Sequence, residues 1–122
     1  MPISYVVDKD RRLVITTATD RVTFAEFQAY QDQLLNDPDF EPEFNQLVDG
    51  TAVTLLDITI QEAKKIAERK VFSSTSRRAF VATSPDTFSI TRLAQAYLTT
   101  LNPASRIHLF SDLASALKWL VG

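Results

Sequence analysis

The stretch from Val48 to Lys65 carries acidic and hydroxyl side chains of the kind that act as nucleophiles and bases. Asp49 stands before Gly50 and Thr51, directly after an apolar run. A phosphoryl-transfer site of the Asp-x-Asp-Gly-Thr type would need a second carboxylate two residues before Asp49, but this position holds Leu47. We therefore predict that Asp49 forms a turn with Gly50 at the end of a strand and takes no part in catalysis.

His108 is the single histidine of the chain, and there is no cysteine. A catalytic triad would need a serine in a Gly-x-Ser-x-Gly turn, which is absent, and a single histidine cannot form a histidine pair around a metal. Two glycines are too few for a phosphate-binding loop. We predict a structural His108, no enzyme activity, no cofactor and no metal. A site assembled in space from Asp49, Asp57 and His108 is the remaining enzymatic alternative.

Composition narrows the class of protein further. The 122 residues include 13 basic and 15 acidic side chains, so there is no basic excess that would displace counterions from a nucleic acid. The basic pairs Arg11-Arg12, Arg69-Lys70 and Arg77-Arg78 are predicted to be solvated surface. The sequence shows no signal peptide and no apolar run of membrane-spanning length. We expect a cytoplasmic location without stable membrane insertion.

Apolar periodicity predicts the elements that position these residues. Five runs rich in β-branched or apolar residues predict strands at Ile3–Asp8, Leu13–Thr19, Phe44–Gly50, Arg78–Thr83 and Arg106–Phe110. The polar residues 9–12 between the first two strands indicate a hairpin.

Four helices are predicted from capping residues followed by apolar stripes. Thr23 with Glu26 and Thr59 with Glu62 have the form of capping boxes. Ser84 or Asp86 is expected to cap the third helix and Ser111 the fourth.

The order is therefore β-β-α-β-α-β-α-β-α, in a single domain over residues 1–122. This order predicts an α/β fold whose mixed, mostly parallel sheet has an antiparallel N-terminal hairpin and covering helices. An exposed sheet edge would also allow a homodimer.

Several stretches resemble small bacterial proteins of the SpoIIAA-like group, which includes anti-sigma-factor antagonists and STAS domains. They are the opening hairpin, LVDGTAVTLLDIT, RRAFVATSPDTFSITR and IHLFSDLASALKWL. The resemblance covers nearly the whole chain and extends distantly to SEC14-type lipid-binding folds. It implies a SpoIIAA-like fold and a non-enzymatic regulatory module that binds a protein partner.

Phosphorylated antagonists carry Asp-Ser-Ser-Gly or Asp-Ser-Thr-Gly before the second helix, and a partner kinase modifies a serine there. The matching stretch of this chain is Asp57-Ile58-Thr59-Ile60, which lacks the first hydroxyl and the glycine. The resemblance thus implies protein binding without the usual serine phosphoswitch. Thr59 is either a helix cap or a residual phosphorylation site, because phosphate is well accommodated at a helix N-terminus.

The connection before the third helix is the second candidate for a contact. Ligands and partners of open α/β sheets favour the carboxyl ends of parallel strands. Phe88 falls outside the apolar stripe of its helix, one turn before Arg92, and either packs the helix entry or contacts a partner. The predicted binding surface therefore comprises Asp57, Thr59, Ser84, Phe88 and Arg92.

The likeness to SEC14-type folds implies an alternative function, namely a carrier or sensor of a small apolar or amphipathic ligand. Such a ligand needs a concave and mostly apolar internal site. The eight phenylalanines of the chain either line such a cavity or fill the core.

Overall fold

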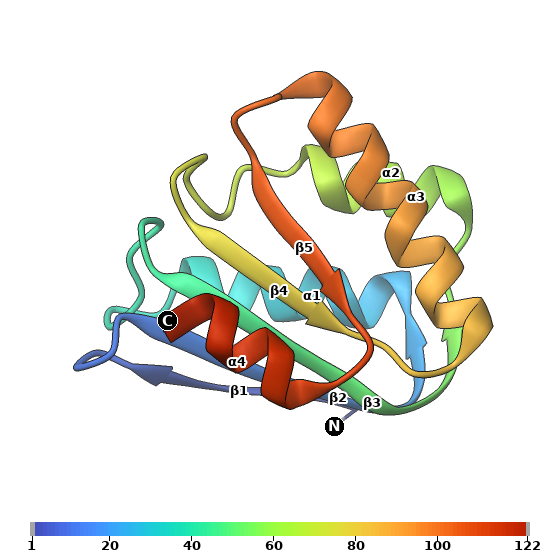
Figure 1. Cartoon of the computed structure of the whole chain (residues 1–122), viewed down its shortest axis with the longest axis horizontal. Coiled ribbons are helices and arrows are strands. Elements are labelled where there is room, and N and C mark those ends of the chain that lie inside the picture. The colour runs from blue at the N-terminus through green and yellow to red at the C-terminus, as the bar shows by residue number, and fades with distance from the viewer. Residues whose placement is uncertain (1, 122) are drawn as a thin grey trace.

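The protein, described here by a computed structural model that covers residues 2–121, has strands and helices in the predicted order (Figure 1). The strands are β1 (Ile3–Asp8), β2 (Leu13–Thr23), β3 (Asn45–Asp57), β4 (Arg77–Val81) and β5 (Arg106–Phe110). The helices are α1 (Phe24–Leu35), α2 (Ile60–Glu68), α3 (Pro85–Leu101) and α4 (Leu113–Val121). One sheet follows the order β1-β2-β3-β4-β5, with β1 antiparallel to β2 and the other neighbours parallel. The predicted α/β class and mixed sheet are confirmed.

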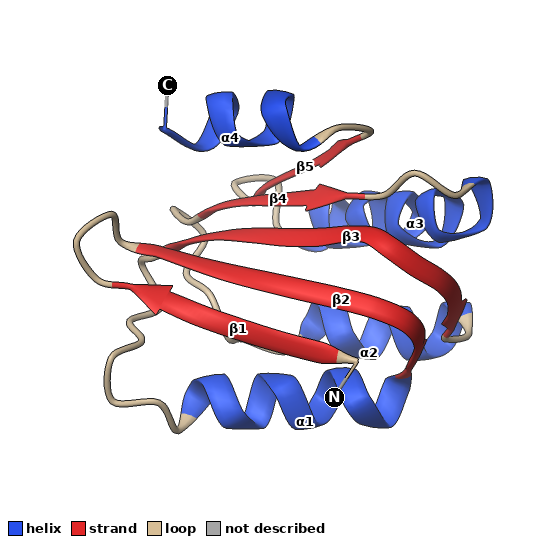
Figure 2. Cartoon of the chain, turned by 90° about the horizontal axis from the view of Figure 1, so that it is seen from below, coloured by secondary structure: helices blue, strands red, loops and turns tan. Residues whose placement is uncertain are grey.

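The helices form two unequal layers on the sheet. Figure 2 shows α1 and α2 below the sheet and α4 alone above it. Helix α3 belongs to the same layer as α1 and α2, because its residues Ile90 and Ala94 pack against the same core. The larger apolar core lies between the sheet and α1–α3 and includes Val14, Leu34 and Phe44. The smaller core lies under α4, where Ala116 and Leu120 pack on the sheet. Because alternate side chains of a strand point to opposite faces, each central strand supplies residues to both cores.

Strand β3 is longer than predicted: it was expected to end at Gly50 and continues to Asp57. Its pairing with β4 ends at Asp49 and Val81, but its pairing with β2 continues to Thr23 and Asp57. The ladder between β2 and β3 is interrupted by two register shifts, and such irregularities bend a strand. Figure 2 shows that the far ends of β2 and β3 curve down toward α1 and α2, the helices that follow them in the chain. The curvature allows Val53 and Ile58 to join the larger core.

The predicted end of the strand at Asp49 is therefore wrong, although the Asp49 side chain accepts a hydrogen bond from the backbone two residues on, as in an Asx turn. The Asp49 carboxylate accepts hydrogen bonds from Thr51 N at 3.0 Å and from Thr51 Oγ1 at 2.7 Å, within the irregular part of β3. Gly50 is buried there, and a Cβ on it would lie 2.7 Å from the carbonyl oxygen of Val81. Glycine is required at this position because the end of β4 approaches the backbone of β3 so closely.

Candidate functional site

The connection between β3 and α2 is closed by the predicted capping box. Thr59 Oγ1 accepts a hydrogen bond from Glu62 N at 3.1 Å, and Glu62 Oε1 accepts one from Thr59 N at 2.9 Å. Such a cap stabilises a helix by about 1 kcal/mol. The capping role of Thr59 is confirmed, and its modification stays a prediction.

The surroundings of this cap combine an ion pair with exposed apolar side chains. Arg21 of β2 donates from Nε to Asp57 Oδ2 at 3.0 Å, and both side chains are exposed. An exposed pair of this kind contributes at most about 1 kcal/mol, but it neutralises the charge of Asp57. Leu55 and Ile60, which stand on either side of the Asp57–Thr59 connection in the sequence, are 50% and 48% exposed. Sequence periodicity missed Leu55 because β3 was predicted to end before it.

The predicted residues of α3 lie on a different surface. Ser84 caps the helix by accepting a hydrogen bond from Thr87 N at 3.2 Å. Phe88 is half-buried and Arg92 is exposed, and both line a shallow depression together with His108 and Leu109 of β5.

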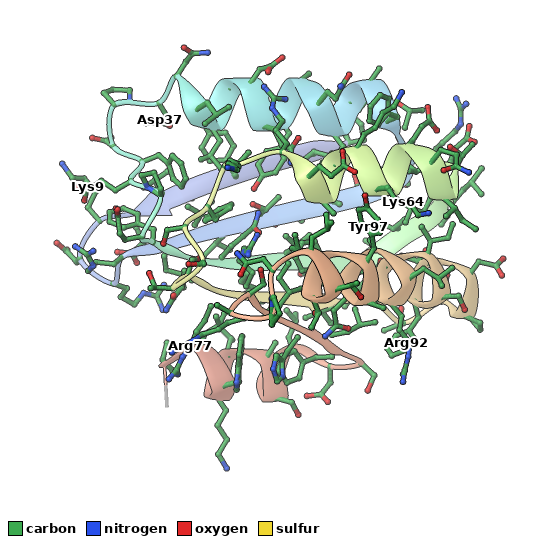
Figure 3. All side chains as sticks on the ribbon, turned by 90° about the horizontal axis from the view of Figure 1, so that it is seen from above. Lys9, Asp37, Lys64, Arg77, Arg92 and Tyr97 are labelled. Carbon is green, nitrogen blue, oxygen red and sulfur yellow. The ribbon has the colours of Figure 1, made fainter. Side chains whose placement is uncertain are left out.

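Contacts between α2 and α3 separate the two groups of predicted residues. Tyr97 of α3 donates a hydrogen bond to Glu68, and Lys64 Nζ lies 5.1 Å from the centre of the Tyr97 ring. Figure 3 shows Lys64 and Tyr97 between α2 and α3, whereas Arg92 points away from α2. Arg92 therefore lies on the flank of α3 opposite to α2, away from the capping box of Thr59.

His108 lies on the α4 side of the sheet. Its ring stacks on Trp119 at a centroid distance of 4.5 Å and an interplanar angle of 21°. Within residues 2–121, no hydrogen bond or ion pair joins His108 to a carboxylate, and no group of three metal-ligating side chains occurs. Asp49 is bonded to Thr51 and Asp57 to Arg21, so the three residues of the enzymatic alternative have separate partners.

The interior between the sheet and α1–α3 contains two adjoining cavities. The first, which we call the apolar cavity, has a volume of about 100 Å³ and is lined by residues such as Val22, Val53 and Ile90. The second, the polar cavity, has a volume of about 90 Å³, and its lining includes Gln31 and Arg78. The interior is thus not completely filled, as the ligand-carrier alternative requires.

Three polar side chains form a hydrogen-bonded group beside the polar cavity. Tyr30 OH lies 2.6 Å from Thr16 Oγ1 and accepts a hydrogen bond from Gln46 Nε2 at 2.8 Å. Burial raises the pKa of Tyr30, and the hydrogen bonds to Thr16 and Gln46 oppose that rise. The hydroxyl is therefore protonated throughout the neutral range.

Two polar atoms near this group are buried without a partner. Gln31 Oε1 and Arg78 Nε have no hydrogen bond, and Gln31 as a whole is 7% exposed. Burial lowers the pKa of Arg78 to about 10, so its guanidinium is still charged at neutral pH.

The prediction that Arg77-Arg78 is solvated surface is wrong for Arg78. Neighbouring residues of a strand point to opposite faces, and β4 is covered on both faces. One arginine of the pair must consequently point toward α1–α3. The burial of Arg78 could have been predicted from the sequence, because the pair begins a strand that was expected to have helices on both faces.

Comparisons with known proteins concern the fold alone. No protein-family model matches the sequence, and neither does any curated protein. A solved structure of an uncharacterised DUF3478-family protein with a SpoIIAA-like fold, from Shewanella loihica PV-4, is similar at a TM-score of 0.61 and 19% identity. An anti-sigma factor antagonist from Mycobacterium paratuberculosis is similar at a TM-score of 0.56 and 18% identity. Each comparison covers 97% of this chain and 93% of the other.

The arrangement of five strands and four helices in residues 2–121 is accordingly a SpoIIAA-like fold, as predicted. No helix in this part of the chain is long and apolar enough to cross a membrane.

Proposed function

We propose that the protein, acting as a single domain, is a regulatory interaction module that binds a protein partner and performs no catalysis of its own. The observation that carries this proposal is the pair of half-exposed apolar side chains, Leu55 and Ile60, beside the cap of α2. Burying a Leu or Ile side chain against a partner contributes about 1.5–3 kcal/mol. The likeness in fold to an anti-sigma factor antagonist supports the same role.

The chemistry of this surface favours an apolar contact that does not depend on phosphate. A phosphate at a helix N-terminus binds to free backbone N–H groups. In α2 the N–H groups of Thr59 and Glu62 already donate hydrogen bonds within the capping box. The nearby carboxylate of Asp57 is neutralised by Arg21. We propose that the partner binds unmodified Thr59 and its apolar neighbours, so that the usual serine phosphoswitch does not operate here.

Ser84, Phe88 and Arg92 belong to a second proposed contact surface, on the flank of α3 that faces β5. Aromatic and arginine side chains are enriched in protein interfaces. This surface requires either a second partner or a partner large enough to reach around α2.

The experiment compares three forms of the tagged full chain purified gently from its native host and analysed by native mass spectrometry. Wild-type protein should carry a stoichiometric partner. The double variant Leu55→Asp/Ile60→Asp should lose it, because burying the exposed half of both side chains contributes roughly tenfold to a hundredfold in affinity. The matched control Leu93→Asp changes a residue of equal exposure (51%) on α3 and should retain the partner.

Two results would contradict the proposal. One is wild-type protein that carries no stoichiometric partner. The other is a complex that survives in the double variant as well as in the control. Intact masses from the same spectra report whether any fraction of the protein is phosphorylated.

A further inference from the structure

Gln31 and Arg78, the two residues that carry an unpaired buried polar atom, both line the polar cavity. Buried polar groups in folded proteins are nearly always hydrogen-bonded, and each exception calls for an explanation. Leaving a buried donor or acceptor unpaired costs about 1–3 kcal/mol, and more for a charged group. Two such atoms in the same cavity indicate that their partner is a molecule that occupies it.

Arg78 is held in this cavity by the sheet and by an aromatic ring. Its register partners are Gln46 of β3 and Ile107 of β5, and all three residues line the polar cavity. The guanidinium carbon lies 5.8 Å from the centre of the Phe72 ring. These contacts fix the position of the guanidinium, but none of them supplies a negative charge.

Within residues 2–121, no carboxylate forms an ion pair with Arg78. No aspartate or glutamate is among the residues that line either cavity. Arg69 also lines the polar cavity, but its charge is balanced by an ion pair with Asp32. The two other glutamines that line the polar cavity are neutral and already donate their Nε2 hydrogens, Gln46 to Tyr30 OH and Gln95 to Ile107 O. The guanidinium therefore retains one uncompensated positive charge within this part of the protein.

The apolar cavity extends the site away from Arg78. Residues shared by the linings of the two cavities are Phe27, Ala63, Ile66, Phe80, Thr91 and Ala94. The volumes of about 100 Å³ and about 90 Å³ together exceed the roughly 150 Å³ of an engineered protein cavity that holds benzene. A hydrocarbon body of six to seven carbon atoms is of this size.

We propose that the two cavities form a binding site for a small monocarboxylate, whose carboxylate pairs with Arg78 and whose apolar body lies in the apolar cavity. The Gln31 amide, turned so that its nitrogen occupies the present position of Oε1, donates to the second carboxylate oxygen, because amide oxygen and nitrogen are interchangeable by rotation. This site is independent of the proposed protein-binding surface and goes beyond it.

The charge of the site selects among ligand classes. One guanidinium balances one negative charge, so a phosphate dianion would bring an uncompensated charge into the interior. A neutral alcohol would leave Arg78 without a counter-charge, and an amine would be repelled by it. A carboxylate alone among these both neutralises Arg78 and accepts its hydrogen bond.

The test is a titration of the ¹⁵N-labelled full chain with hexanoate, hexan-1-ol, hexylamine and inorganic phosphate, followed by NMR. We expect saturable one-to-one binding of hexanoate at least tenfold tighter than that of hexan-1-ol, with shifts of the Gln31 and Gln46 side-chain amides. Arg78→Met should weaken hexanoate binding about tenfold to a hundredfold, as expected for the loss of a charge-assisted hydrogen bond. The control Arg77→Met removes the neighbouring charge on the α4 side, where Arg77 lies over Trp119, and should leave hexanoate binding unchanged.

Several outcomes would overturn the proposal. They are hexan-1-ol binding as tightly as hexanoate, phosphate or hexylamine binding in preference to it, unchanged hexanoate affinity in Arg78→Met, and the absence of saturable binding. If Arg78→Met does not fold, the comparison of hexanoate with hexan-1-ol on wild-type protein decides the question. Neither result bears on the protein partner, which is measured separately.

Discussion

Replacing Tyr30 by phenylalanine removes one oxygen atom that two buried side chains share. Thr16 Oγ1 lies 2.6 Å from this oxygen, and Gln46 Nε2 donates to it at 2.8 Å. Thr16 and Gln46 are 0% and 3% exposed, so bulk solvent does not reach either side chain. An unsatisfied buried polar group costs about 1–3 kcal/mol, and with two partners affected we expect Tyr30→Phe to cost about 2–4 kcal/mol.

Urea unfolding followed by circular dichroism measures this free energy, and calorimetry provides the corresponding melting temperature. A domain of this length loses about 4 °C for each kcal/mol, so the melting temperature should fall by about 8–16 °C. The matched control is Tyr97→Phe, which removes the same atom from an exposed hydrogen bond to Glu68 and should cost less than about 0.5 kcal/mol.

A double variant tests the cause of the loss. Thr16→Val/Tyr30→Phe removes both hydroxyl groups of one hydrogen bond, so that neither hydroxyl remains buried without the other. Its loss of stability should therefore be clearly smaller than the sum of the losses in the two single variants. The reasoning is refuted if Tyr30→Phe loses no more stability than Tyr97→Phe, or if the double variant is fully additive.

Two further predictions concern the backbone and the pH dependence. Gly50→Ala should lower the free energy of unfolding in urea by about 1–3 kcal/mol, because the added Cβ would lie 2.7 Å from the Val81 carbonyl oxygen. The control Ala52→Ser, on the exposed side of β3, should lower it by less than about 0.5 kcal/mol. Equal losses in the two variants would contradict the close approach of β4 to Gly50. Burial raises the pKa of Tyr30, and burial together with the hydrogen bond to Asp37 raises the pKa of Tyr5 to about 12. Since an unfolded tyrosine titrates near pH 10, both protonated hydroxyls stabilise the fold below about pH 10, and this stability should be lost as the pH rises from about 10 toward 12. The lowered pKa of Arg78 acts in the opposite direction over the same pH range, so wild-type protein is compared with Tyr5→Phe. A change in stability between pH 10 and 12 that is the same in both proteins would contradict this prediction.

Local signals in the sequence determined the order of the elements. The capping boxes of Thr23 and Thr59 involve residues three positions apart, and both are formed. The hairpin of β1 and β2 needs only a short polar connection, and its first strand has the predicted bounds. The alternation of strands and helices then implied the mostly parallel sheet, because a helix between two strands carries the chain back to the same end of the sheet.

Distant contacts decided the features that concern function. The extension of β3 to Asp57 depends on its pairing with β2, since β4 accompanies it only as far as Val81. The exposure of Leu55 follows from that extension. The separation of Arg92 from Thr59 depends on α2 packing against the opposite flank of α3.

The clearest contrast lies within the pair Arg77-Arg78. That two cations stand side by side at the start of a strand can be read from the sequence. Their different surroundings come from the packing of the helices, which places Arg77 over Trp119 and leaves Arg78 lining an interior cavity. The physical reason is that a strand sends neighbouring side chains to opposite faces, and what covers each face is contributed by helices far away in the chain.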